Sequence, residues 1–470
     1  MNSFFFYDLE TSGFDPRRQR IMQFAGQRTD MDLKPIGDPI NVYVTLAEDV
    51  LPDPGAVLIT GITPQKTHEE GYNEADFLKL IQEQVFTPGT IITGFNSVRF
   101  DDEFMRYTLY RNFYDPYEWQ WKDGRSRWDM LDVIRMTRAL RPEGIEWPVD
   151  HAGQPTNRLE LLTRENGLDH ANAHDALSDV TALIAIAKLI KDKQPKLFEF
   201  LLKSRGKQEV ARIVNLDDPQ PFVYSSGRYP KGTLHTTVAI PVAPAVHPGT
   251  VIVYDLRHDP TEWATKSVDE LKKIRFAPYE LRQTEGFVAL PAKELAYNKC
   301  PAVAPLGVLD QAAQDRIVLD IKIVQENLAK FRHTDLADKL REVFAADREF
   351  PKNKDVDAQL YDSFIGDRDK PKMAAIRAAN AHELADFVPD FADERLPDLL
   401  LRYKGRNYQQ SLSESEHETW ESYRAARLQA DLPKFTLELH RYATTNTSEH
   451  DQFLLQELQL WAESVAPAPD

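Results

Sequence analysis

Short apolar runs and amphipathic runs alternate along the first 190 residues of the chain. Four runs rich in β-branched and aromatic residues predict strands, at 3–7, 21–28, 40–46 and 90–94. The spacing of apolar and polar positions predicts helices at 73–85, 101–112, 129–139 and 174–192. Strands that alternate with helices in this way are typical of an α/β domain.

The pattern changes near Pro195, where the last of these helices has ended. Residues 219–253 are rich in Pro, Gly, Val and Thr and alternate in short runs, which predicts several short strands in a small β-barrel or sandwich. Helical spacing then returns, and beyond a break at Pro351 the chain is mostly helical to its end. We therefore expect three domains, at 1–190, 195–348 and 351–470.

Composition narrows the possible functions. Among the 470 residues are 57 basic and 74 acidic ones, which give a net charge of −17, and one cysteine, Cys300. A lone cysteine excludes an internal disulfide and a cysteine-cluster metal site. The negative charge argues against indiscriminate binding to nucleic acid or membranes, although it allows a local basic groove. Because the sequence shows neither a signal peptide nor a long apolar run, we expect a cytoplasmic protein that does not bind membranes.

Carboxylates and one histidine form three short motifs. Asp8 and Glu10 close the first predicted strand, and alternate residues of a strand point to one face. Asp101 opens a predicted helix, where an acidic residue also suits the helix dipole. His174 stands five residues before Asp179 in another helical segment. Each motif alone is weak evidence, because a chain with 74 carboxylates contains such fragments by chance.

The chemistry of these residue types is coherent when they are taken together. Four carboxylates at one site repel each other unless cations lie between them, and oxygen ligands without sulfur favour Mg²⁺, with Mn²⁺ as an alternative. Two such ions about 3.5–4 Å apart can bind the attacking and leaving oxygens of a phosphodiester. A histidine can take a proton from the attacking water near neutral pH. The motifs therefore predict two-metal hydrolysis of a phosphodiester.

The order and context of the motifs resemble those of the DEDD exonucleases in which a histidine stands five positions before the last aspartate. The resemblance extends to the bacterial exodeoxyribonuclease I family through residues 54–65, 98–103, 110–117, 140–145, 298–301 and 356–361. It implies an α/β chain with a ribonuclease-H-like exonuclease domain, an SH3-like domain with inserted helices and a helical C-terminal domain. It also implies processive 3′–5′ hydrolysis of single-stranded DNA to 5′-mononucleotides, in DNA repair and recombination.

The same resemblance assigns roles to individual residues. The metal carboxylates would be Asp8, Glu10, Asp101 and Asp179, among which Glu10 and Asp101 also count as catalytic. His174 would be the general base. Arg158 would contact the scissile end of the DNA, and Glu10 would touch the terminal nucleotide as well. For Arg158 the alternative is a solvated arginine at a helix start.

Cations and aromatic residues are interleaved between Arg106 and Trp121. A single strand exposes phosphates and base faces, so this mixture suits its binding, and each stacked base contributes roughly 1–3 kcal/mol. The alternative is an aromatic core beneath helices, which must hold for several of these residues. The residues that we expect to contact DNA are Arg106, Tyr117, Trp121, Arg135, Lys207, Gln359 and Tyr361.

The resemblance also implies a protein partner. The family docks on single-stranded DNA-binding protein through the acidic C-terminal tail of that protein, which requires a basic, partly apolar pocket. We expect Arg141 to form one wall of this pocket. The resemblance further implies that the three domains of one chain form a clamp around single-stranded DNA. Such a chain needs no partner subunit, so we expect a monomer.

Two other hypotheses stay open. A DEDD exonuclease that acts on RNA or in proofreading would use the same chemistry, but such enzymes can work with the nuclease domain alone, whereas this chain continues far beyond residue 190. A scaffold that kept the fold and lost the activity would show no Mg²⁺-dependent hydrolysis. The presence of all four carboxylates and the histidine argues against a scaffold.

Overall fold

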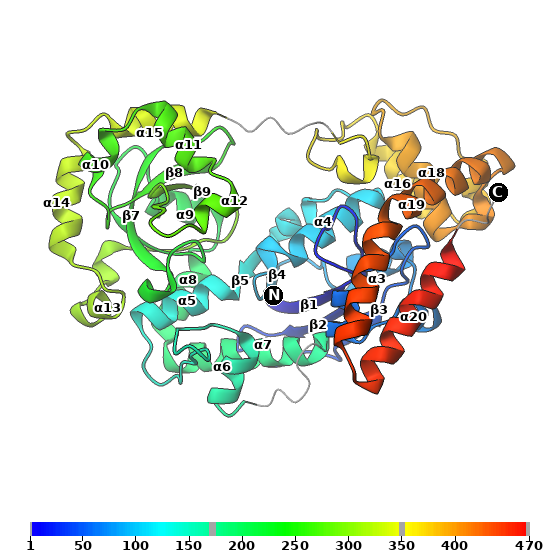
Figure 1. The fold of residues 1–470 in the computed structure, drawn as a ribbon, viewed down its shortest axis with the longest axis horizontal. Coiled ribbons are helices and arrows are strands. Elements are labelled where there is room, and N and C mark those ends of the chain that lie inside the picture. Colours follow the sequence, from blue (N-terminus) through cyan, green and yellow to red (C-terminus); the bar gives the residue numbers. More distant parts are fainter. Residues whose placement is uncertain (1, 169–174, 347–352, 467–470) are drawn as a thin grey trace. The chain divides into compact units, whose positions relative to one another are not determined.

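The computed structural model describes residues 2–168, 175–346 and 353–466 (Figure 1). Its described residues divide into two units, each with its own internal contacts. The first unit holds residues 2–126, 175–181 and 353–466, and the second holds residues 127–168 and 182–346. The three-part division at 1–190, 195–348 and 351–470 stays a prediction.

A mixed sheet forms the centre of the first unit. Its strands in this unit are β1 (Ser3–Thr11), β2 (Ile21–Thr29), β3 (Ile40–Tyr43) and β4 (Thr90–Gly94). The strand order is β3-β2-β1-β4-β5, and β5 (Ser126–Asp129) begins at the last residue of the stretch 2–126 and continues into the second unit. Strand β1 is antiparallel to β2 and parallel to β4. The four strands predicted from the pattern are confirmed. Strand β1 continues past Tyr7, so Asp8 and Glu10 lie inside the strand, opposite Ala25 and Gln23.

Side chains alternate along β1 and divide its two faces. Phe5, Tyr7 and Leu9 are buried in one hydrophobic cluster with residues of the helices α3 (Glu74–Gln84) and α4 (Asp101–Arg111). Asp8 and Glu10 occupy the intervening positions and therefore face the other way. The helices α1 (Pro54–Thr60) and α2 (Pro64–Glu70) precede α3.

The C-terminal helices pack on the N-terminal residues of the first unit. They are α16 (Lys370–Ala378), α17 (Ala381–Ala385), α18 (Leu396–Asn407), α19 (Glu414–Thr445) and α20 (Glu449–Val465). Helices α19 and α20, drawn in red, lie side by side (Figure 1). Leu428 of α19 and Leu458 of α20 share a buried cluster with Met22 and Val57. A second cluster joins Tyr110 to residues of the segment 356–360 and of α18.

The second unit is built around an antiparallel sheet. Its strands are β6 (Phe222–Ser225), β7 (Thr236–Pro244), β8 (Thr250–Asp255), β9 (Ala292–Ala296) and β10 (Ala302–Pro305), in the order β10-β6-β7-β8-β9. The short strands predicted within 219–253 are confirmed as β6, β7 and β8. The core of this sheet includes Phe222, Val251 and Val303.

Helices precede, interrupt and follow the second sheet. They are α5 (Met130–Leu140), α6 (Leu159–Glu165), α8 (Pro195–Lys203), α9 (Lys207–Ile213), α10 (Pro260–Ala264), α11 (Val268–Arg275), α12 (Tyr279–Arg282), α13 (Gln311–Arg316), α14 (Ile321–Phe331) and α15 (Leu336–Ala345). Helix α7 (Ala176–Lys193) begins in the first unit and ends in the second. Across the three described ranges, no helix combines the length and the apolar character that a membrane span requires.

Candidate active site

Three carboxylates from two elements meet in the first unit. Asp8 and Glu10 come from β1, and Asp179 comes from the first turn of α7. One oxygen from each carboxylate lies within 4.8 Å of the other two, and all three side chains are half-buried. Asp8, Glu10 and Asp179, which were predicted from the sequence as metal ligands, therefore lie at one site. An all-oxygen donor set of this kind suits a hard divalent cation.

The carboxylates strongly perturb one another. Burial, followed by the charge of Asp179, holds the pKa of Asp8 well above its usual range. Burial and the charges of Asp8, Asp179 and Asp175 raise the pKa of Glu10 to about 9. Bringing these groups together thus carries an electrostatic penalty that a divalent cation would offset.

The other two predicted residues of the active site are Asp101 and His174, and neither is placed with the three carboxylates by the described residues. Asp101 is the first residue of α4 and is 4% exposed, and it does not belong to the group of three carboxylates within 4.8 Å. His174 lies outside the described residues. Its neighbour Asp175 accepts a hydrogen bond from Gln23, which lies opposite Glu10 in the sheet. The roles of Asp101 and His174 stay predictions.

A buried hydrogen bond links the two motifs at the start of the site. The hydroxyl of Tyr7 donates to a carboxylate oxygen of Asp102 at 2.6 Å. Tyr7 directly precedes Asp8, and Asp102 directly follows Asp101, so this bond fixes β1 against the start of α4. This pair has no distinct signal in the sequence, because an acidic residue in a first helical turn also suits the helix dipole.

Three of the predicted DNA contacts gather around Glu103 of α4. The Arg106 guanidinium donates to Glu103 at 2.5 Å and to the Tyr361 hydroxyl at 3.3 Å, and it lies over the ring of Tyr117. The Tyr361 hydroxyl donates to the other Glu103 oxygen at 2.5 Å. Arg106 itself is buried. The sequence did not point to Glu103 as their shared partner.

Three family models together cover most of the chain. A model described as Exonuclease matches residues 5–187, the Exonuclease I SH3-like domain matches 205–346, and the Exonuclease I C-terminal domain matches 354–465. Exodeoxyribonuclease I of Haemophilus influenzae is 40% identical over 461 residues, which are 97% of each chain. The chain belongs to the exodeoxyribonuclease I family.

Solved structures of this family agree with the fold. Escherichia coli exonuclease I in complex with a dA16 oligonucleotide has a TM-score of 0.94 and 37% identity, over 99% of this chain and 100% of that chain. A zinc-bound form of the E. coli exonuclease I complex with single-stranded DNA has a TM-score of 0.92 and 37% identity, with the same coverage. The expected exonuclease, SH3-like and C-terminal domains are confirmed, and so is the expected nuclease activity class.

The aromatic residues between Arg106 and Trp121 divide between core and surface in this exodeoxyribonuclease I family member. Buried side chains, for which the core alternative holds, are Tyr107, Tyr110, Phe113 and Trp119. Trp121 is 63% exposed, so its face is open to a ligand. Gln359 donates to the carbonyl of Asn353 at 2.6 Å.

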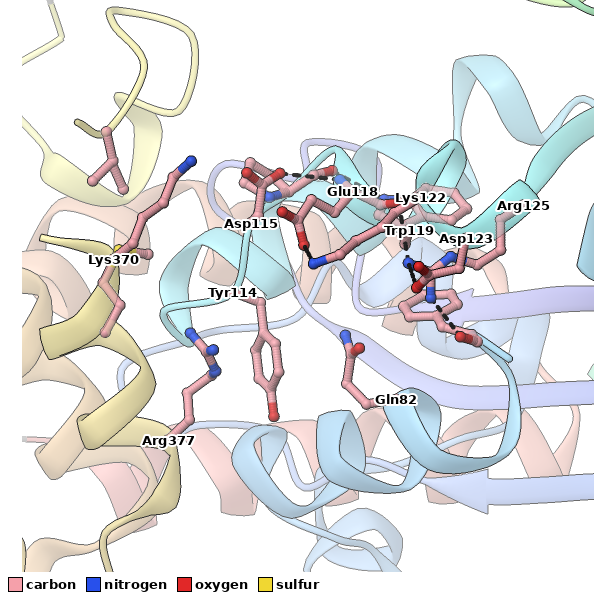
Figure 2. A pocket seen from close by; sticks show the side chains of 14 residues that line it. Gln82, Tyr114, Asp115, Glu118, Trp119, Lys122, Asp123, Arg125, Lys370 and Arg377 are labelled. Atoms are coloured by element: carbon pink, nitrogen blue, oxygen red, sulfur yellow. Dashed lines mark hydrogen bonds and ion pairs between the residues drawn. The ribbon is translucent and has the colours of Figure 1, made fainter. Parts of the chain in front are cut away.

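Two adjoining pockets lie beside this aromatic segment. One of about 480 Å³ is lined by Tyr114, Trp119 and several charged residues, and Figure 2 shows Lys370 and Arg377 on the side opposite Lys122. Its charges are mostly paired, as in the contact of Lys122 with Glu118 at 2.7 Å. The other pocket, of about 290 Å³, is lined by Tyr117 and Phe364 among others. The carboxylates Asp8, Glu10 and Asp179 line neither pocket.

The remaining predicted contacts belong to the second unit. Arg158 precedes α6 and its side chain is 73% exposed. Lys207 opens α9 and is exposed. Arg135 is held by Asp132 at 2.6 Å. Arg141 donates to the carbonyl of Val308 and pairs with Asp310 at 3.1 Å. Their DNA and partner contacts stay predictions.

Proposed function

We propose that this chain is a single-strand-specific 3′–5′ exodeoxyribonuclease that releases 5′-mononucleotides processively in DNA repair and recombination. The observation that carries the proposal is the meeting of Asp8, Glu10 and Asp179 in an exonuclease domain. The oligonucleotide complex of the E. coli relative supports DNA as the substrate.

The site residues suggest how the reaction is organised. Asp8, Glu10 and Asp179 would hold divalent cations, with Asp101 as a fourth carboxylate, and the oxygen-only donor set favours Mg²⁺ or Mn²⁺. Such cations activate water and stabilise the charge that develops on a phosphodiester. The bond from Tyr7 to Asp102 keeps the two carboxylate-bearing elements aligned. In this proposal His174 accepts the proton of the attacking water.

Strand binding would begin next to the carboxylates. Arg106 stands five residues beyond Asp101 on α4, which is a rise of about 7.5 Å along the helix. Arg106, Tyr117 and Tyr361 offer a cation, an aromatic face and a hydroxyl in one place. We propose that they bind the nucleotides adjacent to the scissile end, and that Trp121, Gln359, Arg135, Arg158 and Lys207 add further contacts.

Digestion of a 5′-labelled single-stranded DNA with Mg²⁺ tests the proposal. The wild-type chain should shorten the DNA stepwise from its 3′ end, and both EDTA and the Asp101→Ala substitution should abolish the reaction. Matched duplex DNA and RNA serve as competing substrates. Equal cleavage of RNA or of duplex DNA would refute the proposed specificity for single-stranded DNA, and unchanged cleavage by Asp101→Ala would refute the proposed role of Asp101.

We further propose that the chain is a cytoplasmic monomer that docks on the acidic tail of single-stranded DNA-binding protein. Arg141 is partly exposed, and its charge would pair with a carboxylate of the tail. Fluorescence anisotropy with an acidic tail peptide tests this contact. Arg141→Ala should weaken binding, whereas Arg164→Ala, at an exposed arginine elsewhere in the second unit, should not. Equal binding by both variants would refute the role of Arg141.

A further inference from the structure

Asp357 lies at the centre of a buried ionic cluster in the first unit. Its side chain is fully buried, and one of its carboxylate oxygens lies close to four guanidinium groups. The four distances are 2.5 Å to Arg406, 3.3 Å to Arg402, 3.3 Å to Arg427 and 3.5 Å to Arg20. Asp49 is equally buried and contacts Arg406 at 2.8 Å and Arg427 at 3.2 Å.

Arginines outnumber carboxylates among the buried side chains of this cluster, and the partly exposed Asp355, which pairs with Arg402, lies at its edge. The cluster comprises the arginines 20, 111, 402, 406 and 427 and the carboxylates Asp49, Glu74 and Asp357. A buried charge is tolerated when it is paired and hydrogen-bonded, so the few carboxylates hold the arginines in place. Asp357 contacts four of the five arginines, so the positions of most of the arginines in the cluster depend on it.

Asp357 also belongs to the segment 356–361, which carries the predicted DNA contacts Gln359 and Tyr361. The Tyr110 hydroxyl donates to the carbonyl of Val356 at 3.1 Å, and Arg395 donates to the carbonyl of Gln359 at 2.7 Å. The segment is therefore tied down along its length. Asp357 supplies its only ionic side chain, and that side chain points into the cluster.

Arg20 connects the cluster to the catalytic strand. Its amide donates to the Ser12 hydroxyl, and its carbonyl accepts from the Ser12 amide, both at 2.9 Å. Ser12 follows Glu10 by two residues. A chain of contacts thus runs from the segment 356–361 through Asp357 and Arg20 to the end of β1.

We propose that Asp357 is a positioning residue for strand binding, which holds the segment 356–361 in register with the carboxylates on β1. It does not touch the DNA. The inference rests on the proposed function, because Gln359 and Tyr361 bind the strand only in that proposal. Loss of the carboxylate would leave the carboxylates of β1 in place and would let the strand-binding segment shift.

Asp357→Asn and Asp49→Asn form a matched pair for the test. Both substitutions remove one fully buried carboxylate from the same cluster, but only Asp357 lies in the segment 356–361. Steady-state digestion of a single-stranded 30-mer separates KM from kcat. Partial unfolding lowers the active fraction and therefore kcat, but it does not move KM. Binding of a labelled 30-mer in EDTA gives Kd without catalysis.

We expect Asp357→Asn to raise KM and Kd roughly tenfold, as the loss of a charged hydrogen bond would, while kcat stays within about twofold of the wild type. Asp49→Asn should leave KM and Kd within about twofold. Asp357→Glu keeps the charge and lengthens the side chain, so it should raise KM even if Asp357→Asn fails to fold. A wild-type KM and Kd in Asp357→Glu, or equal rises in both asparagine variants, would overturn the proposal. An inactive wild-type chain that still binds DNA would instead refute the proposed function.

Discussion

Glu10→Gln should stabilise the protein when no divalent cation is present. Glu10 has a pKa of about 9 in the folded chain because of burial and the charges of Asp8, Asp179 and Asp175, whereas its ordinary value is 4.5. At pH 7 the unfolded chain has released this proton and the folded chain retains it. Folding must therefore take up a proton, which costs about 3 kcal/mol. Glutamine has the same shape, is always neutral and avoids this penalty.

The sign of the pH dependence follows from the raised pKa. The folded state binds more protons than the unfolded state between about pH 4.5 and 9, so the wild-type free energy of unfolding falls as the pH rises through this range. The advantage of Glu10→Gln should grow from about 1 kcal/mol at pH 5 to about 3 kcal/mol at pH 7. In Mg²⁺ the difference in free energy of unfolding between the variant and the wild type should shrink or change sign. The wild type gains RT ln(1 + [Mg²⁺]/Kd) of stability from binding the cation, whereas the variant has lost a ligand for it.

Urea unfolding followed by tryptophan fluorescence, in EDTA at pH 5, 6, 7 and 8, measures this effect. Glu69→Gln, at an exposed glutamate, is the control and should show the wild-type pH dependence. If Glu10→Gln is no more stable than the wild type in EDTA at pH 7, or if its curve runs parallel to the wild-type curve, the electrostatic description of the site is wrong. Equal stabilisation of both proteins by Mg²⁺ would show that Glu10 is not a ligand.

Three further outcomes follow from the first unit. Trp121→Ala should weaken binding of single-stranded DNA by about 1–3 kcal/mol, because its exposed ring would no longer stack on a base; anisotropy titration measures this loss. Glu103→Gln should tighten DNA binding about three- to tenfold at low salt, since it frees Arg106 from a competing carboxylate, and the gain should shrink as salt rises. Gly26→Ala should destabilise the protein by about 1–3 kcal/mol in thermal unfolding, because the added Cβ would lie 2.2 Å from the Phe5 ring.

Matched controls separate these effects from general damage. Tyr279→Ala removes another exposed aromatic side chain and should leave the DNA affinity unchanged. Gly232→Ala places a Cβ in open space and should leave the melting temperature unchanged. An unaltered Kd in Trp121→Ala would exclude Trp121 from the strand path, and a weaker affinity in Glu103→Gln would mean that Glu103 supports Arg106 instead of competing for it.

The sequence predicted the elements whose signals are periodic. The strands β1 to β4 were recognisable from short apolar runs, whereas the four-residue strand β5 was not predicted. The period of two placed Asp8 and Glu10 on one face. The helices α1 and α2 were not among the predicted elements, because prolines such as Pro54 and Pro64 mark turns as well as helix starts. Each begins its helix behind a capping side chain, Asp53 or Thr63, which is a recognisable helix start.

The ionic contacts had no local signal at all. Arg20 and Asp357 are 337 residues apart in the chain, and nothing in the neighbourhood of either residue indicates the other. Arg106 was predicted from its aromatic neighbours as a DNA contact, and its burial and its bond to Glu103 depend on which face of α4 packs inward. Contacts between distant residues are fixed by the tertiary fold, and a single sequence does not contain them in readable form.

The clusters shared by the nuclease residues and the C-terminal helices affect how the chain is made in the cell. Val57 is covered by Leu458, a residue that the ribosome adds about 400 positions later. At a translation rate of roughly 5–20 residues per second, the apolar surface around Val57 stays exposed for on the order of 20–80 s before α20 has been synthesised. A premature stop before α19 would leave this apolar surface exposed permanently, and exposed apolar surface favours aggregation.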